Sequence, residues 1–80
     1  MSKRKKRQAD AKIFGLTIRR HREERGWTQE ELAERAEMNA SYLGFVERGD
    51  NVPTLTIILQ IAKALEVEPG ELLREVVARR

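Results

Sequence analysis

Apolar residues recur at helical spacing in two short segments, 29–36 and 40–48, which only three residues separate. Thr28 directly precedes the first segment, and Glu31 lies three residues after Thr28, which is the pattern of a capping box. Asn39 is a good cap for the second segment, which a glycine then ends. Two helices joined this tightly cannot lie antiparallel. They must cross steeply, a geometry typical of units whose second helix enters the major groove of DNA.

Three further segments have helical patterns. One covers about residues 10–25 after a cap at Asp10, one covers about residues 55–65, and one begins at Pro69. The apolar residues that we expect to face inward in the first of these are Ile13, Phe14, Leu16 and Ile18. No strand or hairpin pattern is present, so the sequence predicts an all-α fold, a compact five-helix bundle with a helix-turn-helix, formed by residues 10–80.

Positive charge is concentrated at the N-terminus. The net charge is +3, yet residues 3–7 supply five of the 16 Lys and Arg side chains. The other 11 are outnumbered by 13 Asp and Glu residues, so the rest of the chain has a net charge of −2. We therefore expect residues 1–9 to form a basic, disordered tail. Nucleic-acid binding must then come from local clustering of charge on one face, together with this tail.

Several classes of function find no support in the sequence. The absence of cysteine removes disulfides and thiolate chemistry and favours a cytoplasmic location. No apolar run approaches the length of a membrane span, so no membrane partner is expected. No paired-carboxylate pocket, metal-ligand spacing or glycine-rich phosphate loop is recognisable. We therefore expect no enzyme activity, catalytic residue, metal or cofactor. His21, the only histidine, lies in a charged stretch and is expected to be solvated.

Several motifs occur together and in register over about residues 14–73. They are Arg22, Gly26, Thr28-Gln29-Glu30-Glu31-Leu32-Ala33, Tyr42-Leu43, Val46-Glu47-Arg48-Gly49, Pro53 and Ala62-Lys63-Ala64-Leu65. In this set the chain resembles the Cro/phage-repressor (lambda-repressor-like, XRE-type) helix-turn-helix family. The compact size and the run Val46-Glu47-Arg48-Gly49-Asp50 are also similar to controller proteins of restriction–modification systems.

The resemblance implies a homodimer that binds a palindromic operator in double-stranded DNA and regulates transcription, as a repressor or as an activator that contacts RNA polymerase. It implies that Gln29 contacts a phosphate and braces residues 40–48, and that Arg22 and Glu47 form a partly buried ion pair. Base reading is implied for the outward face of residues 40–48, which would include Gly44. The candidate DNA-binding residues are Arg19, Arg22, Thr28, Gln29, Asn39, Ala40, Ser41, Tyr42, Phe45, Arg48 and Asn51.

The expected reading surface offers few hydrogen bonds. Ser41 can bond to any base, and Ala40 and Phe45 offer only apolar contact, which suits a thymine methyl group. Asn39 could pair with adenine if it is not committed to capping. The surface has no arginine to read guanine. Much of the specificity is therefore expected from DNA shape and from the basic tail.

Two departures from the family pattern bear on this interpretation. Glu37 occupies the turn where the family often has glycine, and a left-handed conformation there would cost about 1 kcal/mol. Gly44 and Phe45 lie where many members carry polar residues. An exposed Phe45 and the acidic surface leave open an alternative, a protein-interaction helix-turn-helix module of antitoxin-like or coactivator-like type. Salt dependence separates the two, because DNA binding weakens steeply as salt rises.

The C-terminal segments carry more apolar surface than packing on one side requires. Ile58, Ile61 and Leu65 are expected in the core. The expected dimer interface lies on the last helix and consists of Leu72, Leu73, Val76 and Val77.

Overall fold

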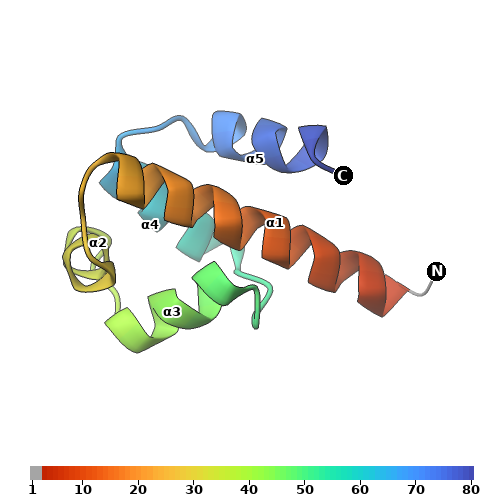
Figure 1. Cartoon of the computed structure of the whole chain (residues 1–80), viewed down its shortest axis with the longest axis horizontal. Coiled ribbons are helices and arrows are strands. Elements are labelled where there is room, and N and C mark those ends of the chain that lie inside the picture. The colour runs from red at the N-terminus through yellow and green to blue at the C-terminus, as the bar shows by residue number, and fades with distance from the viewer. Residues whose placement is uncertain (1–2) are drawn as a thin grey trace.

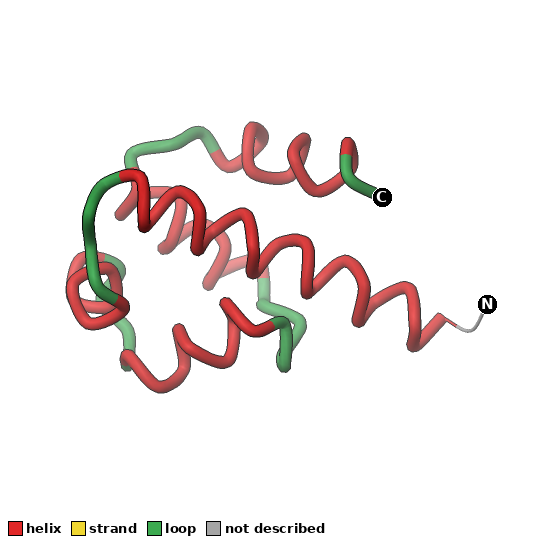
Figure 2. Tube along the Cα trace, in the orientation of Figure 1, coloured by secondary structure: helices red, strands yellow, loops and turns green. Residues whose placement is uncertain are grey.

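A long N-terminal helix forms the spine of the molecule, and the other helices pack along it (Figure 1). The computed structural model describes residues 3–80, with side chains from residue 9 onward. Within these residues the helices are α1 (Lys3–Glu24), α2 (Gln29–Arg35), α3 (Ala40–Arg48), α4 (Leu55–Leu65) and α5 (Pro69–Ala78). Helix α1 contacts α3 on one side and α5 on the other. Figure 2 shows that only short loops join the helices, so the expected all-α bundle is confirmed over the described residues.

The start of α1 differs from the sequence-based expectation. The helix begins at Lys3 and not after a cap at Asp10, so residues 3–9 are helical where a disordered tail was expected. Residues 3–9 contain no glycine or proline, and Lys, Arg, Gln and Ala all favour helix, so no residue in this segment interrupts α1. Asp10 instead accepts two hydrogen bonds from Arg80, at 3.0 and 2.7 Å, which link α1 to the C-terminus.

The core lies where all five helices meet. At least one large apolar side chain from each helix is fully buried, and each such side chain contributes about 1.5–3 kcal/mol. These side chains are Ile18, Leu32, Leu43, Val46, Ile61, Leu65 and Leu72. Phe14 and Ile18 face inward as expected, but Leu16 is 58% exposed. Two residues after Phe14, a helix has turned by about 200°, so Leu16 lies on the opposite side from the face that Phe14 and Ile18 share.

Helices α1 and α3 approach each other through their backbones. A Cβ atom on Gly15 would lie 2.4 Å from the carbonyl oxygens of both Val46 and Glu47. A Cβ atom on Gly49, whose φ is +76°, would lie 2.6 Å from the Cα atom of Lys12. Glycine is therefore needed on both helices at this crossing. The close approach fixes α3 against the spine.

His21 does not behave as the sequence suggested. Its side chain is buried between α1 and α5, with 8% of the residue exposed, and its Nε2 lies 2.9 Å from Oε2 of Glu75. Arg20 bonds to the other oxygen of the same carboxylate. The expectation of a solvated histidine is wrong because His21 lies one helical turn after the buried Ile18 and Thr17, on the same face. The charged sequence around His21 therefore did not indicate exposure, and the adjacent Arg20 shares the Glu75 carboxylate with it.

The Glu75 carboxylate should make stability depend on acid. Burial opposes its ionisation, but hydrogen bonds from His21 and Arg20 outweigh this and hold the pKa of Glu75 below its ordinary value of 4.5. A carboxyl whose pKa is lower in the folded state stabilises the fold above the unfolded-state pKa, and this contribution is lost as pH falls through the folded-state pKa. We expect Glu75→Gln to flatten the decline of the free energy of unfolding below about pH 4.5. Urea denaturation at a series of acidic pH values measures the free energy of unfolding of both proteins.

Glu34, which is exposed on α2, provides the matched control for this measurement. Glu34→Gln should leave the acid decline of stability unchanged. If the free energy of unfolding falls equally steeply in acid with and without the Glu75 carboxylate, this carboxylate does not stabilise the fold.

Candidate nucleic-acid interface

Helices α2 and α3 are joined by the tight turn that the sequence predicted. Glu37 has φ +55° there, so a non-glycine residue adopts the left-handed conformation, at a cost of about 1 kcal/mol. The backbone N–H of Met38 donates to the carbonyl of Ala33 at 2.9 Å, which closes the end of α2. Buried apolar contacts of both helices with the core hold the turn in this shape.

Both helices of the motif begin with the caps expected from the sequence. The hydroxyl of Thr28 accepts from the N–H of Glu31, and the Glu31 carboxylate accepts from the N–H of Thr28, both at 3.1 Å. Asn39 Oδ1 accepts from the N–H groups of Ser41 at 2.7 Å and Tyr42 at 3.4 Å. Since this oxygen is committed to capping, Asn39 cannot offer the donor and acceptor pair that reads adenine.

A buried ion pair locks α3 to α1. Glu47 accepts from Arg22 Nε at 2.7 Å and from Nη2 at 3.0 Å, and its side chain is only 2% exposed. Arg22 Nη1 also donates to the carbonyl of Trp27 at 2.7 Å. The hydrogen bonds with Glu47 raise the pKa of Arg22 above its ordinary range. Gln29 Nε2 donates to the same carboxylate at 3.0 Å, so the expected brace between α2 and α3 is present.

The remaining candidate residues divide by their exposure. Tyr42 and Ala40 are half-buried against the core, whereas Ser41 is exposed on α3. Gly44 is buried because the exposed Arg48 side chain covers it, with Nη1 3.2 Å from where a Cβ atom would lie. The exposed candidates in the described residues are Arg19, Thr28, Asn39, Ser41, Phe45, Arg48 and Asn51. Contact of any of these residues with DNA stays a prediction.

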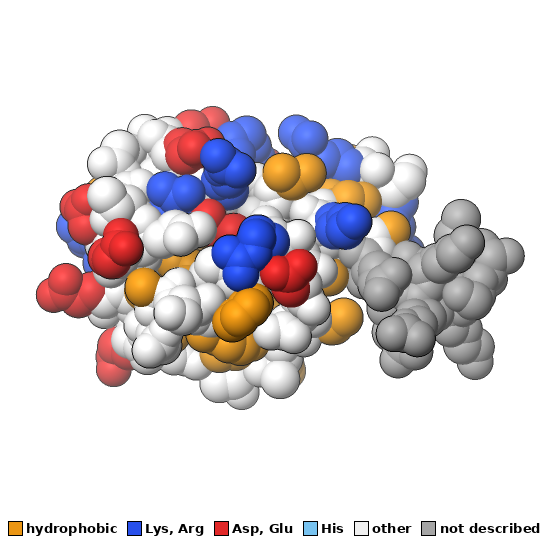
Figure 3. All heavy atoms as spheres, turned by 60° about the horizontal axis from the view of Figure 1, so that its bottom comes forward, with side chains coloured by type: hydrophobic (Ala, Val, Ile, Leu, Met, Phe, Trp, Pro, Cys, Tyr) orange, Lys and Arg blue, Asp and Glu red, His pale blue; other side chains and the backbone are white. Residues whose placement is uncertain are grey.

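The exposed face of α3 carries, at its C-terminal end, a cluster of side chains that the sequence analysis did not predict. The Arg48 guanidinium lies over the ring of Phe45, with Cζ 5.0 Å from the ring centroid, and its Nε donates to Asp50 at 3.0 Å. Figure 3 shows the side of the molecule on which α3 lies, with Lys and Arg side chains next to apolar ones near the middle and many acidic side chains towards one edge. The i, i+3 spacing of Phe45 and Arg48 was the signal available in the sequence.

Two of the four residues expected in the dimer interface are buried within the single chain. Leu72 is fully buried and Val76 is 8% exposed, so both belong to the core. Leu73 and Val77 are exposed, as are Leu55 and Leu59 on α4. Residues spaced four apart share a helix face, so 72 and 76 point inward together while 73 and 77 point outward together.

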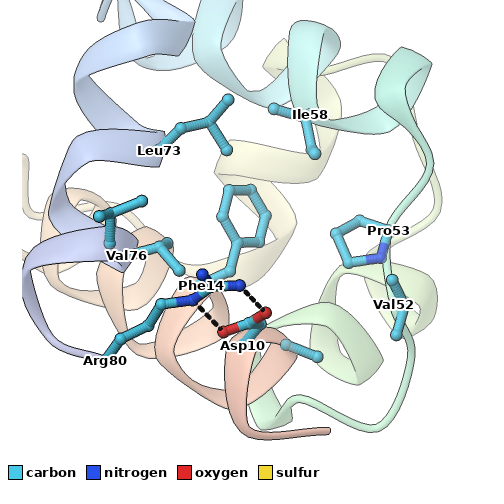
Figure 4. A pocket seen from close by; sticks show the side chains of 10 residues that line it. Asp10, Phe14, Val52, Pro53, Ile58, Leu73, Val76 and Arg80 are labelled. Atoms are coloured by element: carbon cyan, nitrogen blue, oxygen red, sulfur yellow. Dashed lines mark hydrogen bonds and ion pairs between the residues drawn. The ribbon is translucent and has the colours of Figure 1, made fainter. Parts of the chain in front are cut away.

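The exposed side chains of Leu73 and Val77 line an apolar groove between α1, α5 and the α3–α4 loop (Figure 4). The groove has a volume of about 380 Å³. Phe14 projects into it, Val52 and Pro53 form the opposite wall, and the Asp10–Arg80 pair lies at one end.

Two other kinds of site do not occur within residues 3–80. None of the described helices is both long and apolar enough to span a membrane. None of the His, Asp and Glu residues in this part of the chain gather in threes in a way that could hold a metal ion.

The chain is similar to known proteins over the whole helix-turn-helix and the helices around it. The model of the helix-turn-helix family HTH_3 matches residues 18–72. The chain is 38% identical over 63 residues to the HTH-type transcriptional regulator YazB of Bacillus subtilis, covering 79% of this chain and 91% of that protein. The fold is similar to the restriction–modification controller protein C.AhdI from Aeromonas hydrophila, with a TM-score of 0.77, 44% identity, and coverage of 80% of this chain and 97% of that one. It is also similar to the clp gene regulator ClgR from Corynebacterium glutamicum, with a TM-score of 0.81, 26% identity, and coverage of 88% and 91%.

Proposed function

Because the chain belongs to the helix-turn-helix family HTH_3, the XRE-type DNA-binding transcription regulators, we propose that it binds a palindromic operator as a homodimer with α3 in the major groove. The observation that carries this proposal is the division of α3 into two faces. Leu43, Val46 and Glu47 fix one face in the core, and the other face leaves Ser41, Phe45 and Arg48 exposed.

Phosphate contacts would position this helix on the duplex. Thr28 and Gln29 lie at the start of α2, and Gln29 is already fixed to Glu47 through its Nε2 atom. We assign both residues to the DNA backbone, where they set the register without reading sequence. Arg19 and Asn51 are further candidates, since both side chains are exposed. We place the protein in the cytoplasm, with the DNA that it regulates. Contact with RNA polymerase stays a prediction.

Random-site selection with the purified protein tests this function. The expected result is a palindrome whose half-sites lie about 34 Å apart, centre to centre. Gln29→Ala should weaken binding to every sequence by a similar factor, whereas Ser41→Ala should change the base preferred at one position of each half-site. Selection that returns no common sequence would contradict the proposal, as would a Ser41→Ala variant and a Phe45→Ala variant that both keep the original preference.

The dimer is proposed to form through the exposed apolar residues of α5. Leu73→Lys together with Val77→Lys should give monomers in sedimentation equilibrium, because both side chains are exposed in the single chain and a charge there disfavours an apolar contact. Ala78→Lys adds a charge at an exposed neighbouring position and is the control. Dimers that persist in the double variant at unchanged affinity would exclude this face.

A further inference from the structure

The Arg48 side chain runs back along α3 towards the middle of the helix. Its Cζ atom lies 5.0 Å from the centroid of the Phe45 ring, and its Nη1 atom would lie 3.2 Å from a Cβ atom on Gly44. Helical side chains lean towards the N-terminus, so a residue covers the surface one turn before its own Cα atom. The guanidinium therefore occupies the surface that a side chain at Gly44 would otherwise occupy.

Asp50 orients this guanidinium. Its carboxylate accepts from Arg48 Nε at 3.0 Å, and the Arg48 side chain forms no other hydrogen bond within the described residues. The neighbouring Glu47 carboxylate is already occupied by Arg22 and Gln29. The Nη1 and Nη2 groups of Arg48 thus remain available as a parallel pair of donors on the exposed side of α3.

We propose that Arg48 is a specificity-determining residue that reads guanine in the major groove, with Nη1 and Nη2 donating to O6 and N7 of the base. This inference rests on the proposed insertion of α3 into the groove. Gly44 provides the space for the guanidinium, the Phe45 ring supports one face of it, and Asp50 holds its Nε atom. It revises the sequence-based expectation that the reading surface has no arginine for guanine.

The charge of this arrangement favours base reading over phosphate binding. Asp50 neutralises the formal charge of Arg48, which weakens its general attraction to the DNA backbone. Recognition of guanine depends on two donors in a fixed fork geometry, which the contacts with Phe45 and Asp50 supply. An arginine that served mainly as a phosphate contact would not need a carboxylate partner beside it.

Three variants test the proposal on the operator selected by the wild-type protein. Arg48→Lys keeps the charge but loses the fork, and should reduce the preference for guanine over adenine at one position of each half-site by roughly ten- to a hundredfold. Asp50→Ala should raise affinity for unrelated duplexes while it reduces this preference, since it frees a positive charge and releases the fork. Arg74→Lys, on the exposed side of α5, is the matched control and should keep the wild-type preference. Circular dichroism confirms that each variant is folded.

A duplex with 7-deazaguanine at the assigned position removes the N7 acceptor alone. The wild-type protein should bind it more weakly than the guanine duplex, and Arg48→Lys should bind the two nearly equally. A uniform loss of affinity for all sequences in Arg48→Lys would identify a phosphate contact and overturn the proposal, as would an unchanged guanine preference. If the wild-type protein selects no sequence at all, the proposed function itself fails, and that result is distinct from both.

Discussion

Replacing Glu47 with alanine is expected to lower the free energy of unfolding by about 3–5 kcal/mol, because it leaves the buried Arg22 charge without its partner. The Arg22 side chain is 11% exposed, so water cannot solvate it freely. Gln29 loses its acceptor at the same time. For a domain whose free energy of unfolding is about 5–15 kcal/mol, this change removes a large part of the stability. It also removes the contact that holds α3 in position.

Urea denaturation of Glu47→Ala measures the effect, and Glu23→Ala is the control. Glu23 pairs with Arg19 on the surface, where the two side chains are 55% and 57% exposed, so its removal should change stability by less than about 1 kcal/mol. A double variant, Arg22→Met with Glu47→Leu, should recover much of the loss because no unpaired charge then remains. Similar stabilities for Glu47→Ala and Glu23→Ala would show that the ion pair does not hold α3.

Gly15→Ala is expected to have the second-largest effect, through steric overlap between α1 and α3. The new Cβ atom would lie 2.4 Å from two backbone carbonyl oxygens of α3, and backbone cannot move aside as a flexible side chain can. Overpacking of this kind costs about 1–3 kcal/mol, and we expect a value at the upper end because the helices themselves must separate. DNA binding should fall as well, since α3 is displaced from α1 and from the Arg22–Glu47 ion pair that orients it.

Gly70→Ala is the matched control for this substitution. No heavy atom lies within 4 Å of a Cβ atom built on Gly70, so alanine should be neutral or stabilise the fold by up to about 1 kcal/mol. Thermal unfolding of both variants makes the comparison. A Gly15→Ala protein as stable as Gly70→Ala would mean that α1 and α3 are not in backbone contact.

Local signals in the sequence were sufficient to predict the helices of residues 28–80, which are α2 to α5. Thr28, Asn39 and Pro69 each mark the start of a helix, because caps and proline act on the residues next to them. The start of α1 could not be predicted in this way. The sequence suggested a cap at Asp10, and the charge of the segment before it suggested disorder although its residues all favour helix.

The features that the sequence did not predict arise from contacts between residues that only the fold brings together. His21 meets Glu75 across 54 positions of sequence, and periodicity within α1 cannot identify such a partner. On α5 the apolar positions were correct, but periodicity did not show which adjacent pair faces the core. The position of the Arg48 side chain depended on Gly44 having none and on Asp50 lying beyond the end of the helix. The Arg22–Glu47 pair was expected only from the family resemblance.

The salt dependence of binding decides whether α3 contacts duplex DNA, because phosphate contacts release counterions. The association constant for the selected operator should be measured by fluorescence anisotropy over a range of salt concentrations. We expect a linear fall of log K with log salt, with a slope of about −0.9 for each phosphate neutralised. A protein-interaction module would instead ignore duplex DNA. Absence of binding to any duplex at low ionic strength, or an affinity that does not change with salt, would exclude α3 as a DNA-binding helix.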